Sequence, residues 1–152
     1  MRMALAQLDR RHQAQLRTLR LSLAPLEKAV EGFAEATRNW THAVEGSASH
    51  NSYAQRRMND RMMLLERLFI GSSELDDGQA IPRPLAFGPP RGDPYRGTGF
   101  PGLEDLLQAA EDSGPGASQL YRNPLLRHLD QLALVVGRAA RFLREPPDLW
   151  EP

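Results

Sequence analysis

Apolar residues recur along this chain at spacings of three and four, the period of an α-helix. The first long series predicts a helix of about twenty residues that is capped by Ser22, carries Pro25 in its first turn and ends at Gly46. Its row comprises Leu26, Val30, Phe33, Thr37, Trp40 and Val44. A row of this width needs to be buried against other helices.

The segment from Tyr53 to Gly71 predicts a second long helix. Its apolar row comprises Met58, Met62, Leu65 and Phe69, widened by Leu64 and Leu68. Methionines at helical spacing are more often core than interaction surface, so we expect Met62 in the core and leave the side of Met63 open.

The segment "NPLLRHLDQLALVVGRAARFL" predicts a third long helix, with Asn123 as its N-cap and Pro124 at the first helical position. Its row comprises Leu125, Leu129, Leu132, Val136, Ala140 and Leu143. Gly137 within this helix costs about 1 kcal/mol relative to alanine, so we expect another backbone to approach it closely.

Residues 4–12 predict the end of a truncated helix, and the residues after Pro101 predict a short one. No segment alternates convincingly with period two, so the prediction is an all-α fold of the four-helix-bundle type. We expect one domain over residues 1–152: a truncated helix and linker (1–22), two long helices (23–70), a long Pro/Gly-rich loop (71–102), a short helix and the last long helix (103–145), and a tail (146–152).

The composition of the chain argues against two classes of partner, nucleic acids and membranes. Lys and Arg total 19 and Asp and Glu total 19, so zero net charge gives no overall attraction to nucleic acid or an acidic membrane. The longest apolar run, "LALVV", is far shorter than the ~20 residues of a membrane-spanning helix. We therefore expect neither nucleic-acid binding nor membrane insertion by this chain.

The sequence contains no pattern typical of a catalytic or metal site. There is no cysteine, and none of the four histidines has a second histidine at helical ligand spacing. The acidic residues Glu74, Asp76 and Asp77 do not follow the calcium-loop pattern, and we interpret them as a solvated turn. Arg91-Gly92-Asp93 is interpreted as a chance triplet, and Gly97, Gly99 and Gly102 as loop glycines. We expect no catalytic residue, no metal and no cofactor.

Four segments, in order, carry a resemblance to a known family. They are "SLAPLEKAVEGFAEAT", "RMNDRMMLLERLFI", "GFPGLEDLL" and "RHLDQLALVVGRAARFL". Together they resemble the C-terminal dimerisation domain of the transferrin receptor and glutamate carboxypeptidase family, with closer likeness to the peptidase branch. The resemblance implies a helical bundle that holds two chains together. It places the family's two zinc ions in a peptidase domain that precedes this one, and it suggests a cell-surface or extracellular location in eukaryotic relatives.

The resemblance also implies a role for one loop. In the family's acidic-dipeptide peptidases the matching loop carries Lys-Tyr, which binds the substrate's terminal glutamate carboxylates. Here Tyr95 is retained, Pro94 stands at the lysine position, and Arg96 is adjacent. A carboxylate without the lysine loses a charge-assisted hydrogen bond of ~1.5–3 kcal/mol. We interpret Tyr95 and Arg96 as a remnant of a substrate loop.

Three functional hypotheses follow. The first is a non-catalytic homodimerisation module, or one that pairs with a full-length family member. The others are a fragment of a zinc-dependent carboxypeptidase or aminopeptidase, and a receptor-like module that binds a protein through residues 71–102. The residues expected at a dimer interface or in the core are Met58, Met62, Leu65, Leu129, Leu132, Val136 and Gly137. If Val136 lies at the interface, a charge there gives a folded monomer.

Overall fold

The computed structural model describes residues 1–47, 52–70 and 84–144. Its helices are α1 (Arg2–Thr18), α2 (Ala24–Ser47), α3 (Ser52–Arg67), α4 (Pro101–Asp112), α5 (Gly114–Ala117), the 3₁₀ helix η2 (Ser118–Tyr121) and α6 (Arg122–Arg144). The antiparallel pair of strands, β1 (Phe87–Gly88) and β2 (Thr98–Gly99), has two residues in each strand. The all-α prediction is confirmed.

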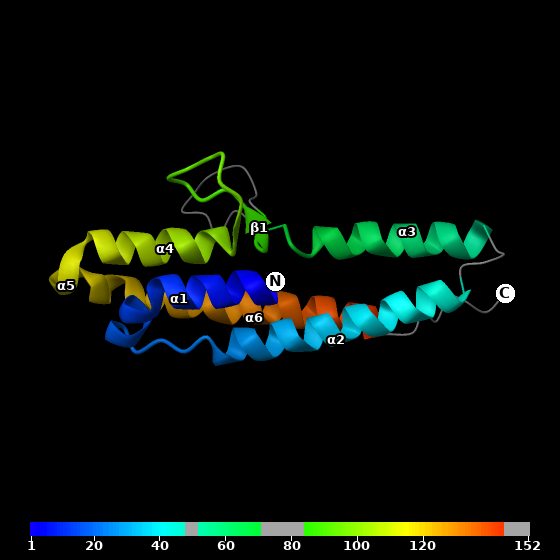
Figure 1. Ribbon diagram of the computed structural model, residues 1–152, viewed down its shortest axis with the longest axis horizontal. Coiled ribbons are helices and arrows are strands. Elements are labelled where there is room, and N and C mark those ends of the chain that lie inside the picture. The colour runs from blue at the N-terminus through cyan, green and yellow to red at the C-terminus, as the bar shows by residue number, and fades with distance from the viewer. Residues whose placement is uncertain (48–51, 71–83, 145–152) are drawn as a thin grey trace.

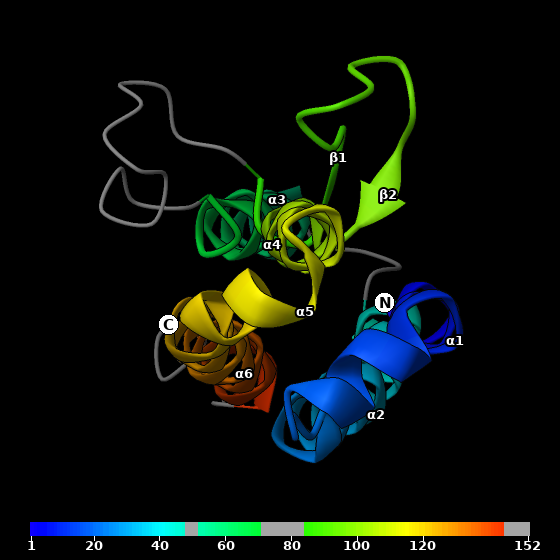
Figure 2. The same ribbon diagram turned by 90° about the vertical axis from the view of Figure 1, so that its left-hand side faces the viewer.

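The helices run along one long axis in three columns (Figures 1 and 2). Helices α3 and α4 follow each other end to end in one column, α6 forms the second, and α1 and α2 share the third. Helices α2 and α6 run in the same direction, whereas α1, α3 and α4 run in the opposite one. None of the described helices is long and apolar enough to cross a bilayer.

The core consists of two clusters along this axis. The larger joins α1, the start of α2, α4 and the first half of α6, and Phe100, Leu103, Leu107 and Leu125 are fully buried in it. The smaller joins the middle of α2, α3 and the end of α6, through Ala36, Leu65, Ala139, Ala140 and Leu143. The predicted apolar row of α6 is buried along its whole length, because its spacing keeps it on one helical face.

Helix α1 is longer than the sequence predicts and turns sharply at its end. It continues from Arg2 to Thr18, with a kink at His12, where φ is −109° and ψ is 19°. Arg20 then takes a left-handed conformation with φ of 51°, and the Leu21 N–H donates to the Leu16 carbonyl at 2.9 Å. This is the hydrogen bond of a Schellman C-cap, made here without glycine.

The predicted helix ends agree with the structure to different degrees. Helix α6 begins at Arg122, directly after η2, so Asn123 lies inside the helix and is not its N-cap. Helix α2 begins at Ala24, whose N–H donates to the Ser22 hydroxyl at 3.2 Å. Helix α3 ends at Arg67, and the expected stop at Gly71 lies outside the described residues.

The buried face of α3 differs from the predicted one. Met58 and Leu65 are buried, but Met62 is 42% exposed and Leu64 is 49% exposed, so the prediction that Met62 lies in the core is wrong. Arg61 takes the inward position between Met58 and Leu65, with its guanidinium 5.2 Å from the ring centre of Trp40 and 4.7 Å from that of Phe142. These stacking contacts favour a face that includes Arg61 over one centred on Met62.

The apolar row of α2 also differs from the predicted row at one position. Thr37 is exposed and its hydroxyl donates to the Phe33 carbonyl at 2.8 Å, while Ala36 is buried in its place. The small side chain of Ala36 lets α2 pack against Ala139 and Ala140 of α6 in the smaller core cluster. The two longest helices therefore meet through alanines at this level of the molecule.

A glycine allows α1 to contact the strand pair. A Cβ at Gly99 would overlap the Cβ of Ala4, whereas no described atom lies within 4 Å of the position that a Cβ at Gly97 would take. The absence of a side chain at Gly99 therefore lets the first turns of α1 lie directly against β2.

Candidate functional site

A buried carboxylate joins α1, α4 and the loop between the two strands. Glu104 is in the first turn of α4, and its Oε1 accepts hydrogen bonds from Arg11 of α1 and from Arg96 Nη2, the latter at 2.8 Å. Its Oε2 lies 3.4 Å from His12 Nε2. Because a buried carboxylate is costly unless it is paired, this arrangement fixes the positions of both arginines.

His12 extends this ion-pair network to the far end of α4. Its ring is fully buried, and Nδ1 lies 2.8 Å from Glu111 Oε1, on the side of the ring opposite to Glu104. The ring thus lies between two carboxylates that are two turns of α4 apart, with a hydrogen bond to Glu111 and a longer contact to Glu104. The kink of α1 at His12 lies at this point of contact.

The loop carrying Tyr95 and Arg96 is held at several points. The Arg91 N–H donates to Asp105 Oδ1 at 2.8 Å, and the Tyr95 N–H donates to Asp93 Oδ1 at 3.1 Å. Tyr95 is 97% exposed, whereas Arg96 turns inward to Glu104. The two side chains therefore have different surroundings, since Tyr95 faces solvent and the Arg96 guanidinium pairs with Glu104.

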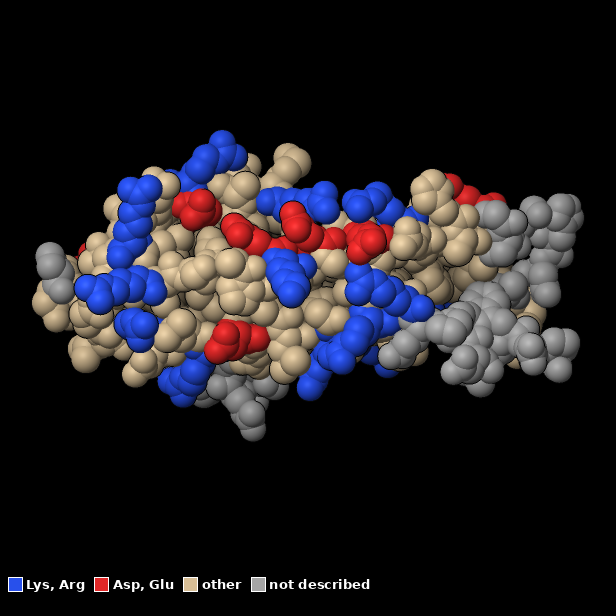
Figure 3. Space-filling model, turned by 90° about the horizontal axis from the view of Figure 1, so that it is seen from below, with Lys and Arg blue, Asp and Glu red and all other residues tan. Residues whose placement is uncertain are grey.

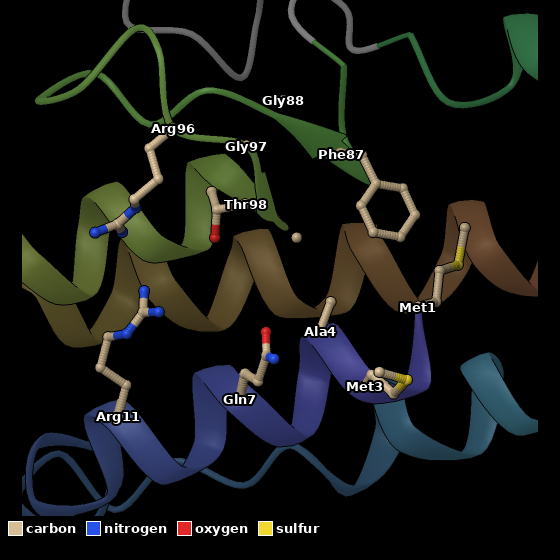
Figure 4. Close-up of a pocket in the computed structure, with 11 residues that line it drawn as sticks. Met1, Met3, Ala4, Gln7, Arg11, Phe87, Gly88, Arg96, Gly97 and Thr98 are labelled. Carbon is tan, nitrogen blue, oxygen red and sulfur yellow. The ribbon is translucent and has the colours of Figure 1, made fainter.

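A groove of about 470 Å³ lies between the start of α1 and the strand pair (Figure 4). Met3 and Phe87 line its apolar part, and Arg11 and Arg96 lie at the other end, with their side chains directed toward one another. Both guanidiniums share Glu104 Oε1, which offsets part of their charge.

The described residues do not fit a zinc site. No group of three His, Asp or Glu side chains in the described ranges is placed to hold a metal ion. His12 with Glu104 and Glu111 comes nearest to one in composition, but the carboxylates contact opposite nitrogens of the ring and do not converge on one point. Glu74, Asp76 and Asp77 lie outside the described residues.

Of the seven residues expected at an interface or in the core, Met62 is exposed and the other six fall into two groups. Met58, Leu65, Leu129, Leu132 and Val136 are buried within this single chain. Gly137 is partly exposed, and none of the described atoms lies within 4 Å of where its Cβ would be, so the expected approach of another backbone is not present in the described chain. A charge at Val136 would therefore enter the core and test the fold rather than an interface.

The outward face of α3 exposes large apolar side chains beside charged ones. Met63 is 54% exposed and Leu64 is 49% exposed, and the neighbouring Asp60 and Arg67 are also exposed. These four residues occupy positions i, i+3, i+4 and i+7, which share one face of a helix. Helix α3 lies along an edge of the molecule, with α2 and α6 on its other side (Figure 1).

Charge is distributed without a large area of one sign on the face drawn in Figure 3. Acidic side chains form a row along the middle of that face, and basic ones lie on both sides of it. One pair on the described surface links α6 to α2: Arg144 Nη2 donates to Glu35 Oε2 at 3.1 Å and to the Gly32 carbonyl at 3.0 Å. The face drawn in Figure 3 therefore mixes both signs of charge and presents no single strong field.

Two structural features were missed by reasoning from the sequence. The first is the network of His12 and Glu104, whose members are far apart in the chain. The second is the inward position of Arg61, for which the sequence did contain a signal, since Arg61 follows Met58 by three residues and precedes Leu65 by four.

The chain matches a family of known protein domains. Residues 14–144 match the family model described as the transferrin receptor-like dimerisation domain. The match begins at Ala14 in α1 and ends at Arg144, the last residue of α6. It includes α3, the strand pair and α4, which carries Glu104.

Proposed function

The chain belongs to the transferrin receptor-like dimerisation domain family, and on that premise we propose that it is a non-catalytic homodimerisation module. The observation that carries this proposal is the outward face of α3. There Met63 and Leu64 remain exposed while the apolar row of α6 is buried within the chain. Exposed apolar side chains beside charged ones are typical of surfaces that pair with another protein.

The physical basis of the module is the burial of this face against a second copy. Each fully buried Met or Leu side chain contributes about 1.5–3 kcal/mol. A stable interface buries about 1,200–2,000 Å² in total, so further surface besides α3 has to take part in a tight dimer.

The mass of the purified chain in solution, measured by light scattering over a concentration series, tests the proposal. We expect a species of twice 17.0 kDa that gives way to the monomer on dilution. A folded monomer at every concentration would contradict the proposal and would place pairing in other domains of a longer protein.

We also propose descent from the peptidase branch of the family. The support is the retained Tyr95 on a loop that Asp93, Asp105 and Glu104 hold in place. In a longer protein, zinc would belong to the preceding peptidase domain, since the described residues here do not fit it. An upstream reading frame that encodes zinc-ligand motifs would support a peptidase parent.

A receptor-like binding module is the remaining candidate. It is favoured by the exposure of Tyr95 at the surface of the same anchored loop. Removal of residues 91–97 with no loss of any bound partner would exclude binding through this part of the predicted 71–102 loop, and removal of the whole loop would test the rest.

A further inference from the structure

The outward face of α3 has a charge pattern that is complementary to itself. Over residues 60–67 it carries Asp60, Met63, Leu64 and Arg67, with the acidic residue at one end, the basic residue at the other and the two large apolar residues between them; the exposed Arg56 lies one turn before Asp60. The opposite face of the helix, with Met58, Arg61 and Leu65, is directed into the molecule. The four outward residues therefore form a surface that the chain's own core does not use.

Asp60 and Arg67 are not engaged elsewhere in the part of the chain that the structure describes. They lie seven residues apart, about two turns of helix or 10 Å along the axis, which is too far for a direct ion pair with each other. Neither has an ion-pair partner among residues 1–47, 52–70 and 84–144. No described residue neutralises their charges, which leaves them facing outward from this part of the chain.

We propose that two copies of this chain pair through α3 in an antiparallel arrangement, with Asp60 of each copy against Arg67 of the other. A two-fold axis between Met63 and Leu64 maps the face onto itself: Asp60 meets the partner's Arg67, and Met63 meets the partner's Leu64. The proposal rests on homodimerisation as the proposed function and names its surface.

Charge selects this orientation over the parallel one. A parallel pair in register would set Asp60 against Asp60 and Arg67 against Arg67, and like charges placed opposite each other disfavour association. The antiparallel pair gives two equivalent ion pairs that flank four apolar side chains, which is the arrangement that a closed two-fold interface requires. The central apolar contact supplies affinity, and the ion pairs set direction and register.

Charge reversal tests the pairing without a change to the core. Asp60→Arg places two arginines at each contact, and Arg67→Asp places two aspartates there. We expect each single variant to raise the dimer dissociation constant about tenfold or more. The double variant Asp60→Arg/Arg67→Asp restores opposite charges at both contacts, and we expect it to dimerise like the wild type.

A mixture of the two single variants gives the sharpest result. In the mixed pair, one copy carries arginine at both positions and the other carries aspartate at both, so all contacts are attractive. Native mass spectrometry of the mixture should show the heterodimer in excess over either homodimer. Asp130→Arg and Arg138→Asp, at exposed positions of α6, make the same changes in net charge and should leave the dissociation constant unchanged.

The outcomes separate the surface from the proposed function. A wild type that is dimeric while the single variants, folded by circular dichroism, dimerise equally well overturns the α3 surface and leaves homodimerisation standing. Loss of pairing in both single variants with no recovery in the double variant or the mixture overturns the reciprocal ion pairs. A wild type that is monomeric at every concentration overturns both proposals.

Discussion

At the scale of single residues, Glu104 connects side chains from separate parts of the structure. It lies in the first turn of α4, where a carboxylate also interacts favourably with the helix dipole. Its two oxygens are shared among Arg11, His12 and Arg96, which come from α1 and from the loop between the strands. One side chain thus couples the position of the first helix to that of the loop that exposes Tyr95.

Glu104→Gln keeps the size of the side chain and removes its charge. Two arginines then lose their shared partner, and we expect the free energy of unfolding to fall by about 2–3 kcal/mol in chemical denaturation. Glu111→Gln is the matched control, because that side chain is 35% exposed and its ion pair in the described part of the chain is with His12, so its cost should stay within about 1 kcal/mol. Equal losses for the two variants would contradict the special role of Glu104.

At the scale of elements, the packing of α1 depends on the close approach of Ala4 to Gly99. The first thirteen residues of the chain lie outside the family match, yet Leu5 and Leu8 are buried in the larger core cluster. These residues extend the hydrophobic core beyond the matched domain, and the missing side chain at Gly99 leaves room for the neighbouring Ala4.

Gly99→Ala should displace α1 from the strand pair and lower the free energy of unfolding by about 1–3 kcal/mol. Hydrogen exchange should show the loss of protection in the first turns of α1. Gly97→Ala is the control, since a Cβ there meets no described atom within 4 Å.

A second variant separates the clash from other effects of the substitution. Ala4→Gly removes the atom that a Cβ at Gly99 would meet, at its own cost of about 1 kcal/mol in helix propensity. If the clash is the cause, Gly99→Ala should cost less in the Ala4→Gly background than in the wild type. An unchanged cost would show that the contact with Ala4 is not responsible.

At the scale of the whole molecule, one side of α6 faces the core and the other side faces the surface. Val136 is 1% exposed within the larger core cluster, whereas Leu134 on the other side of the same helix is 48% exposed. A charge at position 136 would therefore enter the core, whereas a charge two positions earlier, at 134, would remain at the surface.

Val136→Asp buries a charge without a partner, and we expect it to cost more than about 4 kcal/mol and to leave the chain largely unfolded by circular dichroism. Leu134→Asp places the same charge in solvent and should change the free energy of unfolding by no more than about 0.5 kcal/mol. A folded, monomeric Val136→Asp variant would instead place Val136 at an interface.

The sequence alone determined the helical class and most of the element pattern. The row from Leu125 to Leu143 is buried as predicted, because a spacing of three and four defines one face of a helix before any partner is known. The short helix after Pro101 and the resemblance to the dimerisation domain were likewise readable from local sequence, and the family match confirms the family.

Tertiary structure decided which face of α3 is buried and which polar residues are brought together. Arg61 turns inward because Trp40 and Phe142, from two other helices, provide rings to stack on, and this leaves Met62 exposed. His12 and Arg11 meet Glu111 and Glu104 across 99 and 93 residues of chain. Helical periodicity reports only the spacing within one helix, so contacts between distant segments had to come from the packing of the whole fold.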